Sequence, residues 1–159
     1  MVLSNAMFDV IKGDLERLEE RLIEAVSSPE DELVTEVGTH LVTSGGKRIR
    51  PLLTHEFCRI SGGDIEQALP VACAVEILHT YSLIHDDLPC MDNDDYRRGR
   101  LTNHKVYGEG MAVLAGDTLL TDAFSMAVRA KLPKPESVAL AVGVLSECAG
   151  SLGMIGGPV

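Results

Sequence analysis

The chain has 159 residues, a length typical of one domain, so we expect a single hydrophobic core. Its composition is 45% hydrophobic, 24% charged and only 4% aromatic, a balance that favours helices. The formal net charge of -10 argues against a nucleic-acid-binding surface, because a polyanion would be repelled overall and any phosphate site must be a local basic cluster.

The first predicted helix begins near Phe8, where apolar residues start to recur at steps of three and four. The second begins at Pro29, whose ring suits a first helical turn, and Glu30 to Glu32 complement the helix dipole there. Glycine and proline breaks separate the later helices. The expected spans are 8–26, Pro29 to the Gly45-Gly46 pair, 51–60, about 65–87, 111–130 and 136–152.

The predicted helix over 65–87 is apolar on most sides, so we place it in the middle of the fold. Pro70 lies within its first turns, where a proline can kink the helix. No alternating pattern predicts a strand, and the stretch from Pro89 to Gly110 is interpreted as a polar connection. The predicted fold class is all-α, a helical bundle.

The cellular setting follows from what the sequence lacks. Its four cysteines form no C-x-x-C pair, which indicates neither a zinc knuckle nor a disulfide framework and fits a reducing cytosol. No run of about 18 uninterrupted apolar residues exists, and the N-terminus has no secretory pattern. We therefore expect a cytoplasmic protein without stable membrane insertion. Residues 1–6 resemble the remnant of an expression tag, and we expect them to contribute nothing to the fold.

Five carboxylates fall between Asp86 and Asp95, at the end of the apolar helix. Carboxylates this close repel one another, and a hard cation such as Mg²⁺ is the usual reason to tolerate them. On a straight helix Asp86 and Asp92 would point about 120° apart, so we expect Pro89 to break the helix and let Asp92 fold back to the same side. An EF-hand is excluded because Arg97 occupies the position of its glycine. A solvated acidic helix end is the alternative.

Arginines follow the acidic segment at once, in Arg97-Arg98-Gly99-Arg100. Guanidinium groups suit bidentate contacts with phosphate, so the segment offers carboxylates for a metal and cations for a phosphorylated ligand. Local salt bridges to Asp94 and Asp95 are the alternative, above all for Arg100.

A second basic segment, GGKRIRP, joins two predicted helices. Its glycines allow close backbone approach, and Lys47 and Arg50 can face one ligand, although the segment lacks the spacing of a P-loop. A solvated helix cap is the alternative. His79 precedes Asp86 by two helical turns, so both lie on one helix face about 10 Å apart. A histidine there is otherwise a hydrogen-bonded core residue.

Three segments in this order, GGKRIRP, HTYSLIHDDLPCMDNDDYRRGR and TNHKVYGEGMAVLAGDTLL, closely resemble the trans-polyprenyl diphosphate synthases of the farnesyl and geranylgeranyl types. The resemblance implies an isoprenoid-synthase helical bundle, of which residues 1–159 form about the first half of a single domain. It also implies Mg²⁺ as cofactor, isopentenyl diphosphate and an allylic diphosphate (dimethylallyl or geranyl) as substrates, no nucleic acid, and a homodimer.

The resemblance assigns roles to individual residues. Asp86 and Asp92 match the aspartates that bind Mg²⁺ and, with Arg97, would be catalytic by gripping the allylic diphosphate. Arg98 would hold isopentenyl diphosphate. The remaining contacts to that substrate match Lys47, Arg50 and His79.

The implied reaction ionises the allylic C–O bond, after which the double bond of isopentenyl diphosphate attacks the cation and a proton is lost. Metal and guanidinium groups stabilise the leaving charge, and an apolar pocket excludes water. Family members set product length with a bulky residue just before the first aspartate. Tyr81 occupies that place here and resembles the farnesyl type, and geranylgeranyl diphosphate is the close alternative.

The family has a second aspartate-rich motif in its C-terminal half, and this chain stops before it. The chain also has Gly156-Gly157-Pro158 where the family commonly has Gly-Gly-Gln. We therefore expect negligible turnover by this polypeptide alone, and an exposed apolar face that promotes association.

Two other functions compete. A metal-dependent phosphohydrolase could use the His85-Asp86 pair, but it would need further ligands such as His40, His55 or His104. A truncated relative could instead bind diphosphates or regulate a full synthase without catalysing the reaction.

Overall fold

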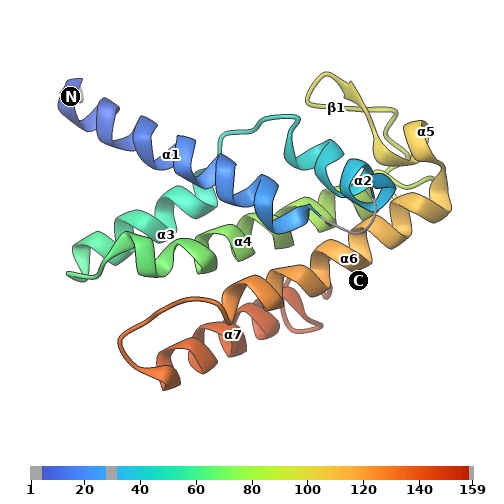
Figure 1. Cartoon of the computed structure of the whole chain (residues 1–159). Helices are drawn as coiled ribbons and strands as arrows, with labels where there is room; N and C mark the ends of the chain where they lie inside the picture. Colours follow the sequence, from blue (N-terminus) through green and yellow to red (C-terminus); the bar gives the residue numbers. More distant parts are fainter. Residues whose placement is uncertain (1–4, 28–31, 158–159) are drawn as a thin grey trace.

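The computed structural model describes residues 5–27 and 32–157, with side chains from residue 11 onward. This part of the chain is a helical bundle with one short hairpin (Figure 1), which confirms the predicted all-α class. The expected helix start at Pro29, Glu30 and Asp31 lies outside the described residues. The elements are α1 (Asn5–Val26), α2 (Glu32–Val42), α3 (Ile49–Ile60), α4 (Ile65–Asp86), β1 (Tyr96–Arg97), β2 (Arg100–Leu101), α5 (Asn103–Tyr107), α6 (Glu109–Ala127) and α7 (Pro135–Ala149).

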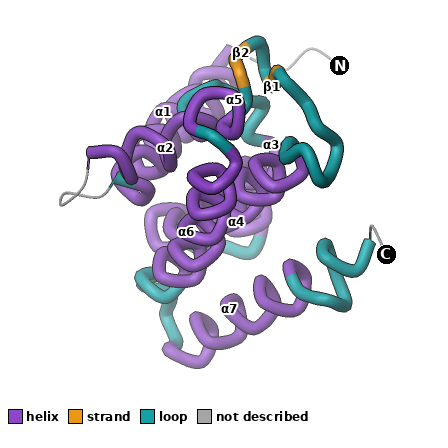
Figure 2. Tube along the Cα trace, turned by 90° about the vertical axis from the view of Figure 1, so that its right-hand side faces the viewer, coloured by secondary structure: helices purple, strands orange, loops and turns teal. Residues whose placement is uncertain are grey.

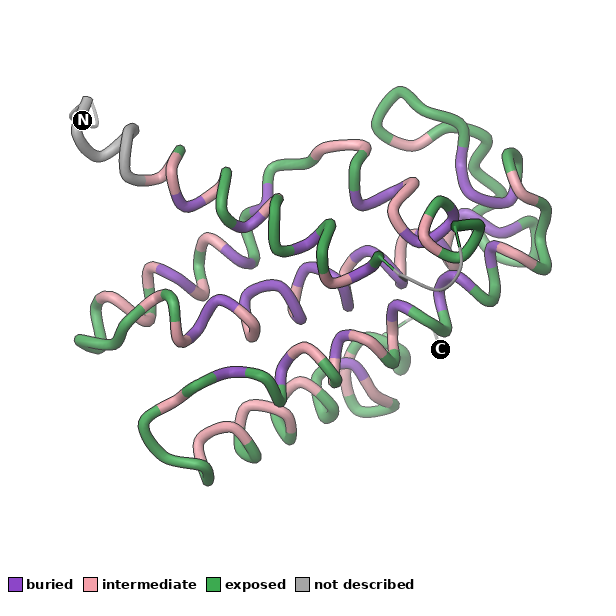
Figure 3. Tube along the Cα trace, in the orientation of Figure 1, coloured by how far each residue is buried: buried purple, intermediate pink, exposed green. Residues whose placement is uncertain are grey.

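Helix α4 is the central element, as its apolar sequence predicts. Figure 3 shows buried residues along most of it, and it packs mainly against α6 and α3. Its start is capped by Asp64, whose carboxylate accepts the backbone N–H of Glu66 at 3.0 Å. The helix runs unbroken through Pro70. By length and composition α4 could cross a membrane, but 61% of that stretch is buried inside the protein, as expected of a core helix.

Small residues bring α6 close to α4. Ala112, Ala115, Gly116 and Ala123 recur at helical spacing and are buried. The approach is tightest at Gly116, where an added Cβ would overlap the ring of His85 on α4. The end of α4 that carries the acidic segment is therefore held directly on the backbone of α6.

The segment interpreted as a polar connection contains three short elements that the sequence analysis missed. β1 and β2 form an antiparallel hairpin with Tyr96 opposite Leu101 and Arg97 opposite Arg100. Arg98 and Gly99 make its two-residue turn, both with positive φ (52° and 78°). Hairpin and α5 lie beside α2 at one end of the bundle (Figure 2). Elements of two to five residues are too short to show periodicity.

A buried arginine ties the basic turn to the bundle. Arg48 has φ 46° and is 3% exposed. Its guanidinium pairs with Glu19 on α1 (Nε–Oε1 2.6 Å) and Glu76 on α4 (Nη1–Oε1 2.8 Å), and donates to the Val42 carbonyl. One side chain thus joins α1, the end of α2 and α4.

Apolar side chains are exposed in rows along α3 and α7, and singly or in pairs on α1, α2 and α6. On α3, Ile49, Leu53, Phe57 and Ile60 follow one another at steps of three and four and are all exposed. On α7 only Ala149 is buried among the residues assigned to that helix, and α7 lies along the edge of the bundle (Figure 2).

Replacing Arg48 by Ala should lower the free energy of unfolding by about 3–5 kcal/mol, because it leaves the Glu76 carboxylate buried without its cation. Urea unfolding followed by circular dichroism measures the change. The matched control is Arg21→Ala, which removes the exposed ion pair with Glu24 and should change stability little. Equal urea midpoints for the two variants would contradict a stabilising role for the buried cluster.

Candidate functional site

The acidic segment bends back on itself at the end of α4. The helix ends at Asp86, before Pro89, and the backbone N–H of Asp92 donates to the Asp86 carbonyl at 2.8 Å. Asn93, with φ 55°, makes the turn, and its N–H donates to the Leu88 carbonyl. The predicted return of Asp92 to Asp86 is therefore confirmed for the backbone.

The two carboxylates act on each other. Burial raises the pKa of Asp86, and the charge of Asp92 raises it further, with a smaller opposing effect from Arg97. The pair is thus a site of concentrated negative charge at the mouth of the bend.

The third carboxylate of the bend has a different partner. Asp87 is 1% exposed and accepts two hydrogen bonds from Arg97 Nε, at 2.7 and 2.9 Å, while Arg97 Nη2 lies 2.6 Å from Oδ1. The hydrogen bond that Arg97 donates to Asp87 is the main cause of the raised pKa of Arg97. Arg97 also approaches Asp94, at 3.5 Å. No role was predicted for Asp87, and only its place on another side of the helix from Asp86 could have indicated one.

The glycines of the basic turn admit an arginine from the hairpin. Gly45 and Gly46 both have positive φ, 80° and 147°. Arg98 donates to the Gly45 carbonyl, and a Cβ added to Gly46 would lie 2.8 Å from Arg98 Nη1. A side chain at Gly46 would therefore displace Arg98 from the turn.

Four of the predicted substrate-binding residues line one cavity of about 340 Å³. Its lining residues are Lys47, Arg50, His79 and Arg98, together with Gly46, Arg48, Ile49 and Glu76. In the described part of the chain Lys47 and Arg50 form no ion pair, unlike the buried Arg48. The cavity is therefore rich in cations whose charge is not neutralised by the protein.

Electrostatics in the cavity show this excess of positive charge. Burial, followed by the charges of Arg50, Arg98 and Arg97, lowers the pKa of His79 to about 4, so the imidazole is neutral near pH 7. Burial and the nearby Arg48 also lower the pKa of Arg98. Nearby cations thus act on Arg98 and on His79, and an anionic ligand would relieve their repulsion.

The hairpin joins the cationic cavity to the acidic bend. Its neighbouring residues Arg97 and Arg98 contact Asp87 on one side and Gly45 on the other. His79 and Asp86 lie two turns apart on the same helix, about 10 Å along its axis. Both basic segments and the carboxylates thus gather around the C-terminal half of α4.

Tyr81 lies beneath the bend. It is 5% exposed, and its ring packs edge to face on His85 with the centroids 5.8 Å apart. Burial and the charge of Asp86 raise the pKa of its hydroxyl. The side chain is therefore part of the hydrophobic core next to the bend.

The histidines required by a phosphohydrolase are not assembled. His85 Nε2 contacts the Val113 carbonyl at 3.1 Å, and His40 Nε2 contacts the Leu101 carbonyl at 2.8 Å. His104 contacts Thr102, and His55 is buried on α3. Among the side chains that the structure describes, in residues 11–27 and 32–157, no three His, Cys, Asp or Glu residues form a cluster that could hold a metal by themselves.

Known proteins share this sequence and fold. The polyprenyl synthetase family model matches residues 31–152. The chain is 48% identical over 152 residues to a dimethylallyltranstransferase of Fischerella ambigua, covering 95% of this chain and 44% of that protein. It is 48% identical over 147 residues to the chloroplastic geranylgeranyl pyrophosphate synthase 7 of Arabidopsis thaliana, covering 92% of this chain and 42% of that protein.

Solved structures of similar proteins have the same fold. An FPP/GFPP synthase from Zymomonas mobilis superposes with a TM-score of 0.88 at 38% identity, over 94% of this chain and 55% of that one. A geranyltransferase from Legionella pneumophila superposes with a TM-score of 0.86 at 35% identity, over 94% of this chain and 54% of that one. The chain spans about half the length of these relatives. Because the family match covers most of the sequence and the fold agrees over nearly all of it, the chain belongs to the polyprenyl synthetase family.

Proposed function

We propose that this chain forms the diphosphate-binding wall of a trans-prenyltransferase that condenses isopentenyl diphosphate with an allylic diphosphate. The observation that carries the proposal is the cavity lined by Lys47, Arg50, His79 and Arg98 next to the acidic bend. Such a cavity suits an anionic group, and the bend offers carboxylates for a bridging metal.

Isopentenyl diphosphate is the ligand assigned to the cationic cavity. Lys47 and Arg50 are exposed and form no ion pair in the described residues. Their side chains can therefore bind a diphosphate without breaking an existing ion pair. Arg98 contributes a fork of N–H donors. Neutral His79 adds a hydrogen bond without adding charge.

Asp86 and Asp92 fit magnesium as the cofactor. Magnesium is commonly held by one or two carboxylates while substrate phosphates and water complete its shell. The bend supplies two adjacent carboxylates whose mutual repulsion a cation would relieve. When bound, magnesium would withdraw charge from the diphosphate of the allylic substrate. Asp87 is not included among the ligands, because Arg97 occupies both of its oxygens.

The side chains of this protein then serve the reaction in three ways. Arg97 is held by Asp87 with its guanidinium at the bend, where it stabilises the charge that develops on the leaving diphosphate. Arg98 and the basic turn orient isopentenyl diphosphate for attack. Tyr81 and the apolar residues below it exclude water from the allylic cation.

Tyr81 supports a farnesyl-length product, because its buried ring limits the depth of the space below the bend. Geranylgeranyl diphosphate is the alternative, since several of the similar proteins carry that name. The proposal includes a cytoplasmic location and a homodimer, whose contacts would cover exposed apolar residues such as Leu140 and Val144 on α7.

Lys47→Ala should weaken the binding of isopentenyl diphosphate about tenfold, the usual effect of losing a hydrogen bond to a charged group. Isothermal titration calorimetry at fixed ionic strength measures the affinity. Lys12→Ala is the matched control, because Lys12 lies exposed on α1 beside Glu16. If both variants bind as the unchanged protein does, the cationic cavity is not the site.

Asp86→Asn should stabilise the chain near pH 7 in the absence of divalent cations. A raised carboxyl pKa stabilises the folded protein at low pH, and that contribution is lost as pH rises through the raised value. We expect a gain of less than about 1 kcal/mol in the free energy of unfolding at pH 7. No difference should remain near pH 3, where the carboxyls are protonated in both states.

Urea titrations at the two pH values, with and without magnesium, test this prediction. Magnesium should stabilise the unchanged protein and not the variant. Glu20→Gln, which alters an exposed carboxylate on α1, serves as the control and should show neither effect. A loss of stability in Asp86→Asn at pH 7 would refute the repulsion between Asp86 and Asp92.

Tyr81→Ala should lengthen the products by at least one isoprene unit in a form of the protein that catalyses prenyl transfer, because it removes the wall below the bend. Chromatography of the dephosphorylated products gives their lengths. Tyr96→Ala is the control, since Tyr96 is 66% exposed on the hairpin. The same product lengths in both variants would show that Tyr81 does not limit the chain.

A further inference from the structure

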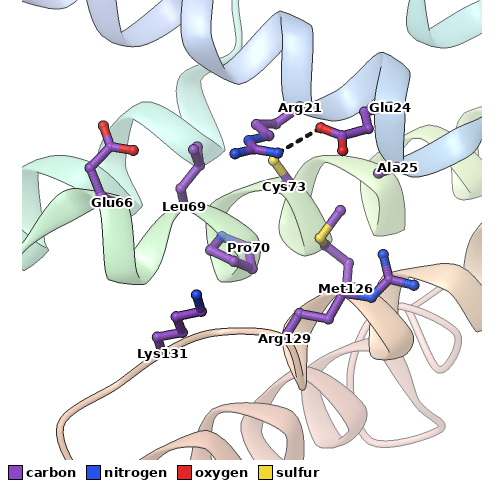
Figure 4. A pocket seen from close by; sticks show the side chains of 10 residues that line it. All are labelled: Arg21, Glu24, Ala25, Glu66, Leu69, Pro70, Cys73, Met126, Arg129 and Lys131. Carbon is purple, nitrogen blue, oxygen red and sulfur yellow. Dashed lines mark hydrogen bonds and ion pairs between the residues drawn. The ribbon is translucent and has the colours of Figure 1, made fainter.

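A second cavity of about 350 Å³ lies between α1, the N-terminal half of α4 and the end of α6. Figure 4 shows its side chains converging from these three helices and from the segment after α6. The volume falls within the range of small-molecule sites. None of its lining residues belongs to the cationic cavity near the acidic bend.

The floor of this cavity is apolar. It is formed by Ala25, Leu69, Pro70, Cys73 and Met126. Cys73 is completely buried, and burial raises the pKa of its thiol to about 12, so the group stays neutral. A ligand lying on this floor must present an alkyl or similar apolar part.

The rim of the cavity is cationic. Arg129 and Lys131 are exposed at its edge and form no ion pair with any described residue. The acidic groups nearby are already engaged, since Glu24 pairs with Arg21 at 2.6 Å and Glu66 pairs with Arg17. Asp122 precedes Arg129 in the sequence. Burial raises the pKa of Asp122, and the charge of Arg129 opposes this effect.

This rim differs from the rest of the chain, whose formal net charge is -10. Two unpaired cations beside an apolar floor can neutralise one acidic head group and no more. A free inorganic anion would leave the floor unused, and a neutral hydrocarbon would leave the cations unused. An apolar floor beside two cations therefore fits a ligand that has both a hydrocarbon part and an acidic head group.

We propose that this cavity binds an amphiphilic anion, with a short alkyl chain on the floor and a single phosphate or carboxylate head at Arg129 and Lys131. This site goes beyond the proposed prenyl transfer and does not depend on it. A phosphate and a carboxylate would bind the same two cations, and titration with one probe of each kind distinguishes them.

Octyl phosphate and octanoate, titrated below the concentrations at which they form micelles, are the probes. The ¹³C-labelled methyl group of Met126 reports binding by NMR. We expect both probes to shift this resonance, and the doubly charged phosphate to bind several-fold more tightly than octanoate. Inorganic phosphate and octan-1-ol should each bind at least tenfold more weakly than octyl phosphate. Equal affinity for either of these single-part probes would overturn the proposal.

Variants locate the site. Arg129→Ala and Lys131→Ala should each weaken octyl phosphate about fivefold, the effect of an exposed ion pair at the upper end of its range. Lys134→Ala is the matched control, because it lies on the same segment outside the cavity and should change nothing. Arg98→Ala should also leave the affinity unchanged. Equal losses in Lys131→Ala and Lys134→Ala, or a loss in Arg98→Ala, would place the probe elsewhere and overturn the site.

Discussion

The ion pair between Arg48 and Glu76 is the interaction on which the site depends. Both side chains are buried, and the same guanidinium reaches Glu19 on α1 and the carbonyl at the end of α2. Arg48 thereby fixes the turn between α2 and α3. This position of the turn places its neighbours Lys47 and Arg50 in the lining of the cavity. A buried charge is costly without a partner, so this anchor has few alternative positions.

Charge is distributed unevenly around this anchor. Asp87 and Arg97 neutralise each other, whereas Asp86 and Asp92 repel each other and the cations of the cavity do the same. The protein thus holds two unsatisfied charge clusters of opposite sign along one side of α4. A ligand that carries both a metal and phosphates would relieve the repulsion at Asp86 and at Arg98 together.

The long helices could be predicted because their apolar stretches continue over several turns and are bounded by glycine and proline breaks. The return of Asp92 followed from Pro89, and the grouping of Lys47, Arg50 and His79 followed from motif resemblance. The hairpin and α5 escaped prediction because local turn geometry, not hydrophobic pattern, forms them. The inward position of Arg48 depends on Glu19 and Glu76, which lie 29 and 28 residues away in sequence, so no local pattern could show it. The same holds for the pairing of Asp87 with Arg97.

The contact of His85 with Gly116 links the acidic bend to α6 rather than to the basic turn. Helix α4 itself sets the spacing between the clusters, because it carries Asp86 as well as Glu76 and His79. A residue larger than glycine at position 116 would overlap the ring of His85 and push α6 away from the end of α4. Gly116 is therefore a position where the size of one side chain decides whether α6 can support the acidic bend.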